Sequence, residues 1–272
     1  MIELPSAMSS FSRSQRFGIS LFIGLAIIVT IAALLAPRTD LPASYHHFAD
    51  TRSWLGIPNF GDVASNFLFL VAGMWGLFFL STEASRSRFA DTREKWPYVF
   101  VFIGLVWTAF GSGYYHLAPD NQRLVWDRLP MIFVFMPFVA ALIAERVNVN
   151  IGLWSLPILT AIGVASVFQW RESFEHGSGD IRFYAAVQLY AAAAVIAALF
   201  LPSRYTRCWD LIWVAIFYAI AKIAEMSDHQ IFAAGRIISG HTIKHLAAGA
   251  AGLAILRILQ TRSPYSLAEK TL

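Results

Sequence analysis

Five polar side chains in two short stretches of the chain have types and spacings suited to metal-assisted chemistry. His241 and His245 lie four residues apart at the start of the last apolar run. Side chains at this spacing share one face of a helix, so both imidazoles can point at one ion. Helical zinc sites use this spacing, with a third protein ligand from elsewhere and water at an open position. We interpret His116, at the end of an earlier apolar run, as that third ligand.

Two further side chains near His116 could act on a substrate beside such a metal. Asp127 follows His116 by eleven residues, and its carboxylate could take a proton from water and later deliver it to a leaving group. Ser112 lies one helical turn before His116, where its hydroxyl could stabilise a developing oxyanion. A serine that eases a close Gly-Ser-Gly helix crossing is an equally good interpretation of Ser112.

Histidines near a membrane surface also have a simpler interpretation, in which their rings lie at headgroup depth and hydrogen-bond water. We assign that role to the four remaining histidines, His46, His47, His176 and His229. For the other three, the nearby carboxylate of Asp127 favours the metal site.

The composition is that of an integral membrane protein. Of the 272 residues, 57% are hydrophobic and 14% are charged, whereas charged residues make up about a quarter of a soluble domain. The nine Trp and 22 Phe suit helices that face lipid and its interfaces. The net charge of +4 includes no basic arm, which argues against nucleic acid as a partner. The single cysteine, Cys208, excludes an internal disulfide and a cysteine-based metal cage.

Eight apolar stretches are long enough to cross about 30 Å of hydrocarbon. They lie at 17–36, 62–81, 96–116, 128–144, 152–170, 182–201, 209–226 and 238–258. The first resembles a signal peptide, but it is longer than a typical signal core and lacks a cleavage site before Pro37, so we expect it to be retained. The predicted fold class is all-α, a polytopic membrane helical bundle in one membrane domain.

Lysine and arginine residues in the connections predict the orientation of these helices. With a cytoplasmic N-terminus, twelve fall inside: Arg13, Arg16, Arg86, Arg88, Arg93, Lys95, Arg146, Arg204, Arg207, Arg257, Arg262 and Lys270. Seven fall outside: Arg38, Arg52, Arg123, Arg128, Arg171, Arg182 and Arg236. Both termini are therefore expected in the cytoplasm, and the five site residues near the outer, periplasmic or lumenal face.

The combination of these motifs resembles the alkaline ceramidase family, membrane-integral zinc hydrolases related to the adiponectin-receptor-like proteins. The resemblance covers about residues 55 to 258. It depends on Ser65-Asn66, on Ser112, His116 and Asp127, with Leu-Pro-Met after the next residue, and on the late Gly-His-x-x-x-His.

The resemblance implies an activity and a role for each residue. His116, His241 and His245 would hold Zn²⁺, Asp127 would assist the attacking water, and Ser112 would support the oxyanion. The implied reaction is hydrolysis of the amide of a ceramide-like N-acyl sphingolipid, a membrane lipid, to a sphingoid base and a fatty acid.

The resemblance also implies a division of the chain. Residues 1–61 would form an N-terminal transmembrane helix and an outer loop, residues 62–258 a seven-helix hydrolase core, and residues 259–272 a cytoplasmic tail.

Animal members of the family carry a calcium site on an acidic, Trp-containing N-terminal segment. The loose counterpart here is Asp50, Trp54, Asn59 and Asp62. For these residues we favour an ordinary loop, with Asp62 capping a helix, over Ca²⁺ binding.

Other functions are open at this stage. A non-enzymatic seven-helix receptor or transporter could keep the metal as a structural element, and a proton or ion carrier could use the His and Asp residues as a relay. Lys222 and Glu225 are predicted to form a pair inside the bundle, either orienting His241 or His245 or serving only structure. We do not favour a retinal-type Schiff base on Lys244, which lies near a helix end between two histidines.

Overall fold

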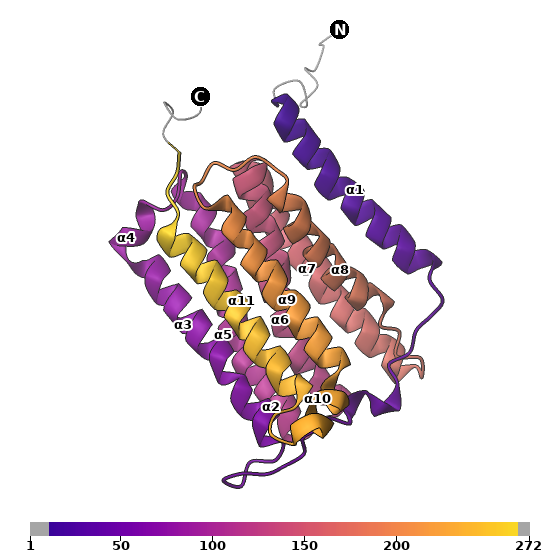
Figure 1. Cartoon of the computed structure of the whole chain (residues 1–272). Coiled ribbons are helices and arrows are strands. Elements are labelled where there is room, and N and C mark those ends of the chain that lie inside the picture. Colours follow the sequence, from indigo (N-terminus) through magenta and orange to yellow (C-terminus); the bar gives the residue numbers. More distant parts are fainter. Residues whose placement is uncertain (1–10, 266–272) are drawn as a thin grey trace.

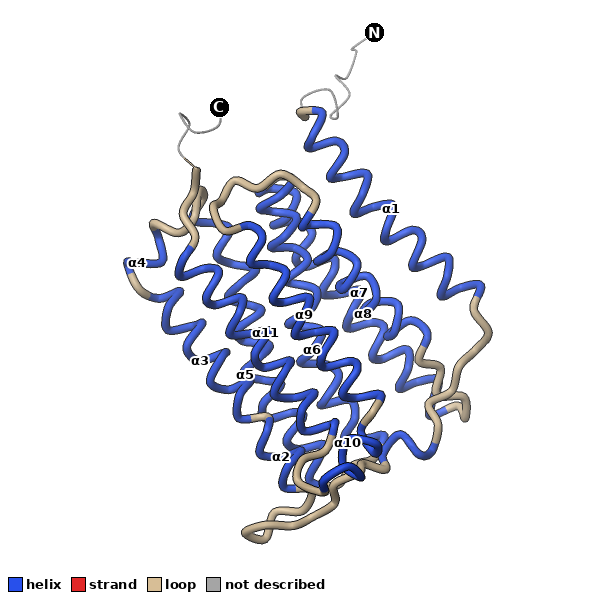
Figure 2. Tube along the Cα trace, viewed as in Figure 1, coloured by secondary structure: helices blue, strands red, loops and turns tan. Residues whose placement is uncertain are grey.

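A bundle of long α-helices forms the whole of the described structure, a computed structural model of residues 11–265 (Figures 1 and 2). The elements follow in the order α1 (Arg13–Leu35), η1 (Ala43–His46), α2 (Phe60–Ser65), α3 (Phe67–Ser81), α4 (Glu83–Arg86), η2 (Thr92–Glu94), α5 (Lys95–Leu117), α6 (Asn121–Arg146), α7 (Val149–Glu175), α8 (Arg182–Leu199), η3 (Cys208–Asp210), α9 (Leu211–Met226), α10 (Asp228–Gly235) and α11 (Gly240–Thr261), where η marks a 3-10 helix. Residues 11–265 contain no β-strand, only isolated bridges in connections. The predicted all-α class is confirmed.

Seven of the helical segments in the described part of the chain are long and apolar enough to cross a membrane, which makes the chain a polytopic membrane protein. The segment Phe60–Ser81, made of α2 and α3, counts as one of them. The eighth predicted span, 209–226, corresponds to α9, which has only 16 residues because η3 occupies the positions before it. A helix of that length is slightly short for a full hydrocarbon crossing.

The first helix stands at the edge of the bundle (Figure 1). Its start is stabilised by a capping box, in which the Ser12 side chain accepts from the Gln15 backbone and the Gln15 side chain accepts from the Ser12 backbone. Along its length α1 packs mainly on α8, and it reaches the end of α6 through a hydrogen bond from Gln15 Nε2 to the Val147 carbonyl. Helix α1 is therefore attached to the bundle mainly through α8.

Two glycines let neighbouring helices approach closely at the end of the bundle where α2 and α10 lie. A Cβ on Gly111 of α5 would lie 2.1 Å from the Trp126 carbonyl oxygen of α6. A Cβ on Gly240 of α11 would lie 2.2 Å from the Ala224 carbonyl oxygen of α9. Because real side chains cannot approach backbone this closely, only glycine permits either crossing.

The opposite end of the bundle is held by a buried network of charged and aromatic groups. Arg262, just after α11, pairs with Glu145 of α6, and Tyr98 donates to the same carboxylate at 2.6 Å. Glu94 accepts from Arg204 at 2.7 Å and from Tyr205 at 2.5 Å. The network joins α5, α6 and α11 to the connection before α9.

Three sequence predictions about element boundaries need correction. Helix α6 begins at Asn121 rather than at residue 128, because Asp120 caps it by accepting from the Arg123 backbone. Asp127 and Arg128 therefore lie within a helix, and Arg128 is buried there rather than in an outer connection. The predicted tail over 259–272 overlaps α11, which continues to Thr261; residues 266–272, including Lys270, lie outside the described part of the chain.

Candidate metal centre

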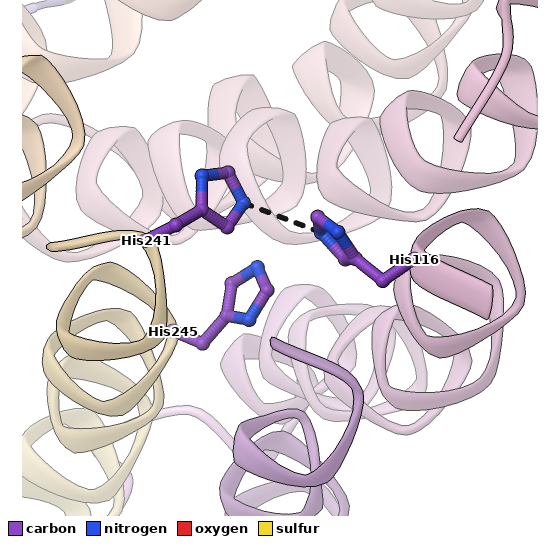
Figure 3. Close-up of side chains that lie close together, drawn as sticks. All are labelled: His116, His241 and His245. Atoms are coloured by element: carbon purple, nitrogen blue, oxygen red, sulfur yellow. Dashed lines mark hydrogen bonds between the residues drawn. The ribbon is translucent and has the colours of Figure 1, made fainter. Parts of the chain in front are cut away.

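Three buried histidines from two helices meet at the end of the bundle that contains α2 and α10 (Figure 3). His116 comes from the last turn of α5, and His241 and His245 come from the first turns of α11. One nitrogen of each ring can be chosen so that all three lie within 4.8 Å of one another, and His116 Nε2 is 3.2 Å from His241 Nε2. The sequence prediction that these three residues converge is confirmed.

The start of α11 is shaped so that both of its histidines face inward. Ser239 caps the helix by accepting from the Thr242 backbone at 3.0 Å. The His241 backbone N–H donates to Asp228 Oδ1 at 2.8 Å, which satisfies one of the free donors of the first turn. The close approach at Gly240 brings this turn against the end of α9.

His245 is oriented through its second ring nitrogen. Its Nδ1 lies 2.9 Å from Ser65 Oγ and 3.1 Å from the Asp62 carbonyl oxygen. With Nδ1–H donating to these acceptors, Nε2 is the unprotonated nitrogen, which is the form that binds a metal. The Asp62 carboxylate in turn accepts from Thr242 at 2.8 Å and from Ser239 at 3.1 Å, so α2 and α11 hold each other in register.

The loop between α1 and α2 covers this histidine cluster. The Phe48 ring packs on His116 and His241, with centroid distances of 4.7 and 4.3 Å. Asn59 Nδ2 donates to the His116 carbonyl oxygen at 2.8 Å, and the Ala49 backbone donates to Asp228 at 2.9 Å. The cluster is therefore enclosed by apolar and hydrogen-bonding groups rather than open to water.

The three imidazoles fit a divalent transition metal. They are buried, and imidazole nitrogen suits zinc, copper, iron and nickel. Three protein ligands leave one position of a tetrahedral site for water or substrate. His116 Nδ1 has no hydrogen-bond partner among residues 11–265, so its ring is oriented by packing rather than by an acceptor.

A large cavity of about 690 Å³ opens beside the cluster. Ser112, Asp127 and His245 line it together. Most of the remaining wall is apolar and comes from α5, α6, α8, α9 and α11. All five predicted site residues thus lie at the cavity or at the histidine cluster beside it.

Charged groups from α9 and α11 complete the polar end of the cavity. Glu225 accepts from Lys222 at 2.5 Å and from Lys244 at 3.0 Å, so the predicted Lys222–Glu225 pair is present. Lys244 Nζ also lies 3.1 Å from His241 Nε2. The pair is therefore linked to a histidine of the cluster through Lys244.

Three of the four residues considered for calcium have side chains with other hydrogen-bond partners. Both oxygens of Asp50 hydrogen-bond Arg52, which lowers the pKa of Asp50 below its usual value of 3.8. Asn59 is itself the N-cap of α2 and donates to His116, whereas Asp62 lies in the first turn without capping it. The expectation that Asp62 caps the helix is therefore wrong, because its carboxylate is used by α11.

The remaining histidines differ from one another. His176 and His229 are exposed, as expected for interfacial rings. His46 is half-buried and hydrogen-bonds the Tyr115 hydroxyl at 2.9 Å and Asn121 at 3.0 Å. This burial lowers the pKa of His46 below 6.5.

Residue patterns assign no role at the site to four groups: Ser65, the Asp62 carbonyl, Lys244 and Arg128. The Asp62 carbonyl acts through a backbone atom, which no residue pattern reveals. Arg128 lines the cavity, and its signal in the sequence is a cation directly after Asp127 in an otherwise apolar stretch.

The chain matches no protein-family model and no curated protein. The likeness to the alkaline ceramidases therefore consists of the motifs alone.

Proposed function

We propose that this protein is a zinc-dependent membrane amidase that hydrolyses ceramide-like N-acyl sphingolipids to a sphingoid base and a fatty acid. The observation that carries the proposal is the convergence of three buried histidines beside a lipid-sized cavity lined by Ser112 and Asp127. The motif resemblance supports the choice of lipid.

In this proposal His116, His241 and His245 would hold zinc. Zinc bound by three imidazoles supplies Lewis-acid chemistry, since it makes water more acidic and polarises a carbonyl group. The cavity would position the acyl chain along its apolar wall, with the amide at the polar end.

Asp127 and Ser112 would carry the proton transfer and the charge stabilisation. Asp127 takes a proton from water as the water oxygen bonds to the amide carbon, and the Ser112 hydroxyl donates to the carbonyl oxygen as negative charge develops there. The C–N bond then breaks, and Asp127 returns the proton to the amine nitrogen that leaves. The products are a carboxylic acid and a free amine.

The burial of the cluster supports a role in hydrolysis rather than simple metal binding at the protein surface. Phe48 and the loop over the histidines exclude bulk water, which strengthens electrostatic interactions with a developing oxyanion. The orientation proposed for the site is toward the periplasmic or lumenal face, on the basis of the Lys and Arg distribution.

The test combines metal content with product analysis. Purified protein is expected to carry about one zinc per chain, to lose it in the His241→Ala variant, and to retain it in the exposed control His229→Ala. Mass spectrometry of lipids incubated with the protein should detect sphingoid base and fatty acid, and Asp127→Asn should abolish them while keeping zinc. Protein without zinc would refute the proposal, and zinc without any amide product would favour the alternative, a receptor or transporter with a structural metal.

A further inference from the structure

Arg128 is a buried cation without a protein acceptor. It lies in α6, inside a membrane-spanning segment, and is 1% exposed. Its Nε, Nη1 and Nη2 atoms have no hydrogen-bond partner among residues 11–265. A guanidinium has five N–H donors and is always charged, and ionisable residues within membrane spans characteristically mark ligand or ion sites.

Aromatic rings surround the Arg128 guanidinium but do not use its donors. Its Cζ atom lies 4.1 Å from the ring centroid of Trp170, 4.7 Å from that of Tyr184 and 5.7 Å from that of Tyr45. The negative faces of such rings attract a cation. They do not replace acceptors in the plane of the guanidinium, where its N–H groups point.

A second buried arginine in the same chain provides an internal comparison. Arg262 also lies near three aromatic rings, with Cζ 4.0 Å from the Tyr205 centroid, yet it pairs with Glu145 and donates to the Arg88 carbonyl at 3.1 Å. Its aromatic enclosure therefore includes an anion. Arg128 has the enclosure without the anion, and it lines the 690 Å³ cavity rather than a closed core.

Two carboxylates line the cavity, and neither accepts a hydrogen bond from Arg128. Glu225 accepts from Lys222 and Lys244, and the Arg128 guanidinium makes no hydrogen bond to Asp127. Arg128 is thus the lining cation for which the described residues supply no acceptor, and the lining carries three cations against two carboxylates. An anionic ligand group would supply the missing acceptor for Arg128 and would balance the excess positive charge of the lining.

We propose that Arg128 binds the oxyanion of an acidic amphiphile, a carboxylate, phosphate or sulfonate, whose hydrocarbon chain occupies the apolar part of the cavity. That part is lined by Met131, Val134, Phe135, Ala191 and Val195. The planar fork of arginine matches two oxygens of such a group at once. The inference rests on the proposed function for the amide bond, and it narrows the substrate class to N-acyl lipids that also carry an acidic group.

The test is a comparison of matched amphiphiles at pH 7.5, with the full chain in neutral detergent and with a chelator present so that no hydrolysis occurs. N-dodecanoylglycine carries a carboxylate, and N-dodecanoylglycinamide has nearly the same size without charge. We expect the carboxylate to bind about tenfold more tightly or better. Dodecyl phosphate should share this preference, whereas inorganic phosphate alone should bind far more weakly because it lacks the chain.

Variants separate recognition from structure. Arg128→Gln should abolish the preference for the charged ligand, whereas Arg123→Gln, which removes a partly exposed cation five residues earlier in α6, should keep it. Arg128→Met should melt no lower than the native protein, because removing an unpaired buried charge relieves its desolvation cost. A structural role alone would lower the melting temperature and weaken both amphiphiles equally.

Three results would overturn the inference: equal affinity for the two glycine derivatives, inorganic phosphate binding as tightly as dodecyl phosphate, or an unchanged preference in Arg128→Gln. None of these results depends on zinc or on turnover. Failure of the proposed amidase would leave the binding preference in place, and failure of the preference would leave ceramide hydrolysis in place.

Discussion

Replacing Ser65 by alanine tests whether the hydrogen bond behind His245 prepares that ring for a metal. The Ser65 hydroxyl lies 2.9 Å from His245 Nδ1 and is buried. Removing a hydrogen-bond partner of a metal-binding histidine typically weakens metal affinity about 10- to 100-fold. The Asp62 carbonyl at 3.1 Å remains available to the same nitrogen, so we expect the lower end, about tenfold, or about 1.4 kcal/mol.

The assay is competition for zinc between the purified protein and a chromophoric chelator at fixed pH. Ser85→Ala is the matched control, because Ser85 is also a buried serine but donates to the Leu80 and Thr82 carbonyls away from the cluster. Zinc affinity should fall in Ser65→Ala and stay within about twofold of the native value in Ser85→Ala. Equal affinities in the two variants would refute the reasoning that Ser65 orients His245.

Three further predictions concern the scaffold of the bundle. Gly111→Ala should prevent stable folding or displace α5 from α6, because its Cβ would lie 2.1 Å from a carbonyl oxygen. Gly113 has open space around it, so Gly113→Ala should be neutral or stabilising by up to about 1 kcal/mol. Thermal melts in detergent compare the two variants. Glu145→Ala should cost about 3–5 kcal/mol by leaving Arg262 buried and unpaired, and Glu145→Leu combined with Arg262→Met should recover most of that loss in denaturant titrations. The folded-state pKa of Asp50 is lowered by Arg52, so this carboxylate contributes its stability above pH about 3.8 and loses it only at lower pH. The difference in proteolytic protection of the covering loop between the native protein and Asp50→Asn should therefore be constant between pH about 5 and 8.

The histidine cluster could be predicted from the sequence because its geometry is largely local. Two of its members share one helix face at a spacing of four residues, and the third ends a helix at the same end of the bundle. Alternation of spans across a membrane places such helix ends in one layer without any knowledge of packing. The positions of Ser112 and Asp127 near the cluster could be predicted for the same reason. Both residues lie within about four helical turns of His116, either along the same helix or across one short connection.

The hydrogen-bond partners of the cluster could not be predicted in the same way. Ser65 and the Asp62 carbonyl reach His245 across about 180 residues of sequence, and a backbone oxygen leaves no mark in residue types. Lys244 contacts Glu225 only because α9 and α11 pack side by side. Such contacts depend on how far each helix is rotated, which hydropathy does not encode.

Apolar length and helical periodicity are local properties of the chain, and they are enough to predict the membrane class, most of the helical spans and the five residues of the candidate site. The early start of α6, seven residues before the predicted one, and the position of Arg128 in the cavity instead of a loop are seen only in the folded bundle. The physical reason is that burial of a charge is decided by its surroundings. Aromatic rings from α7, α8 and the α1–α2 loop come together around Arg128 only in the folded bundle, and they turn a charge expected at the surface into a candidate ligand-binding group.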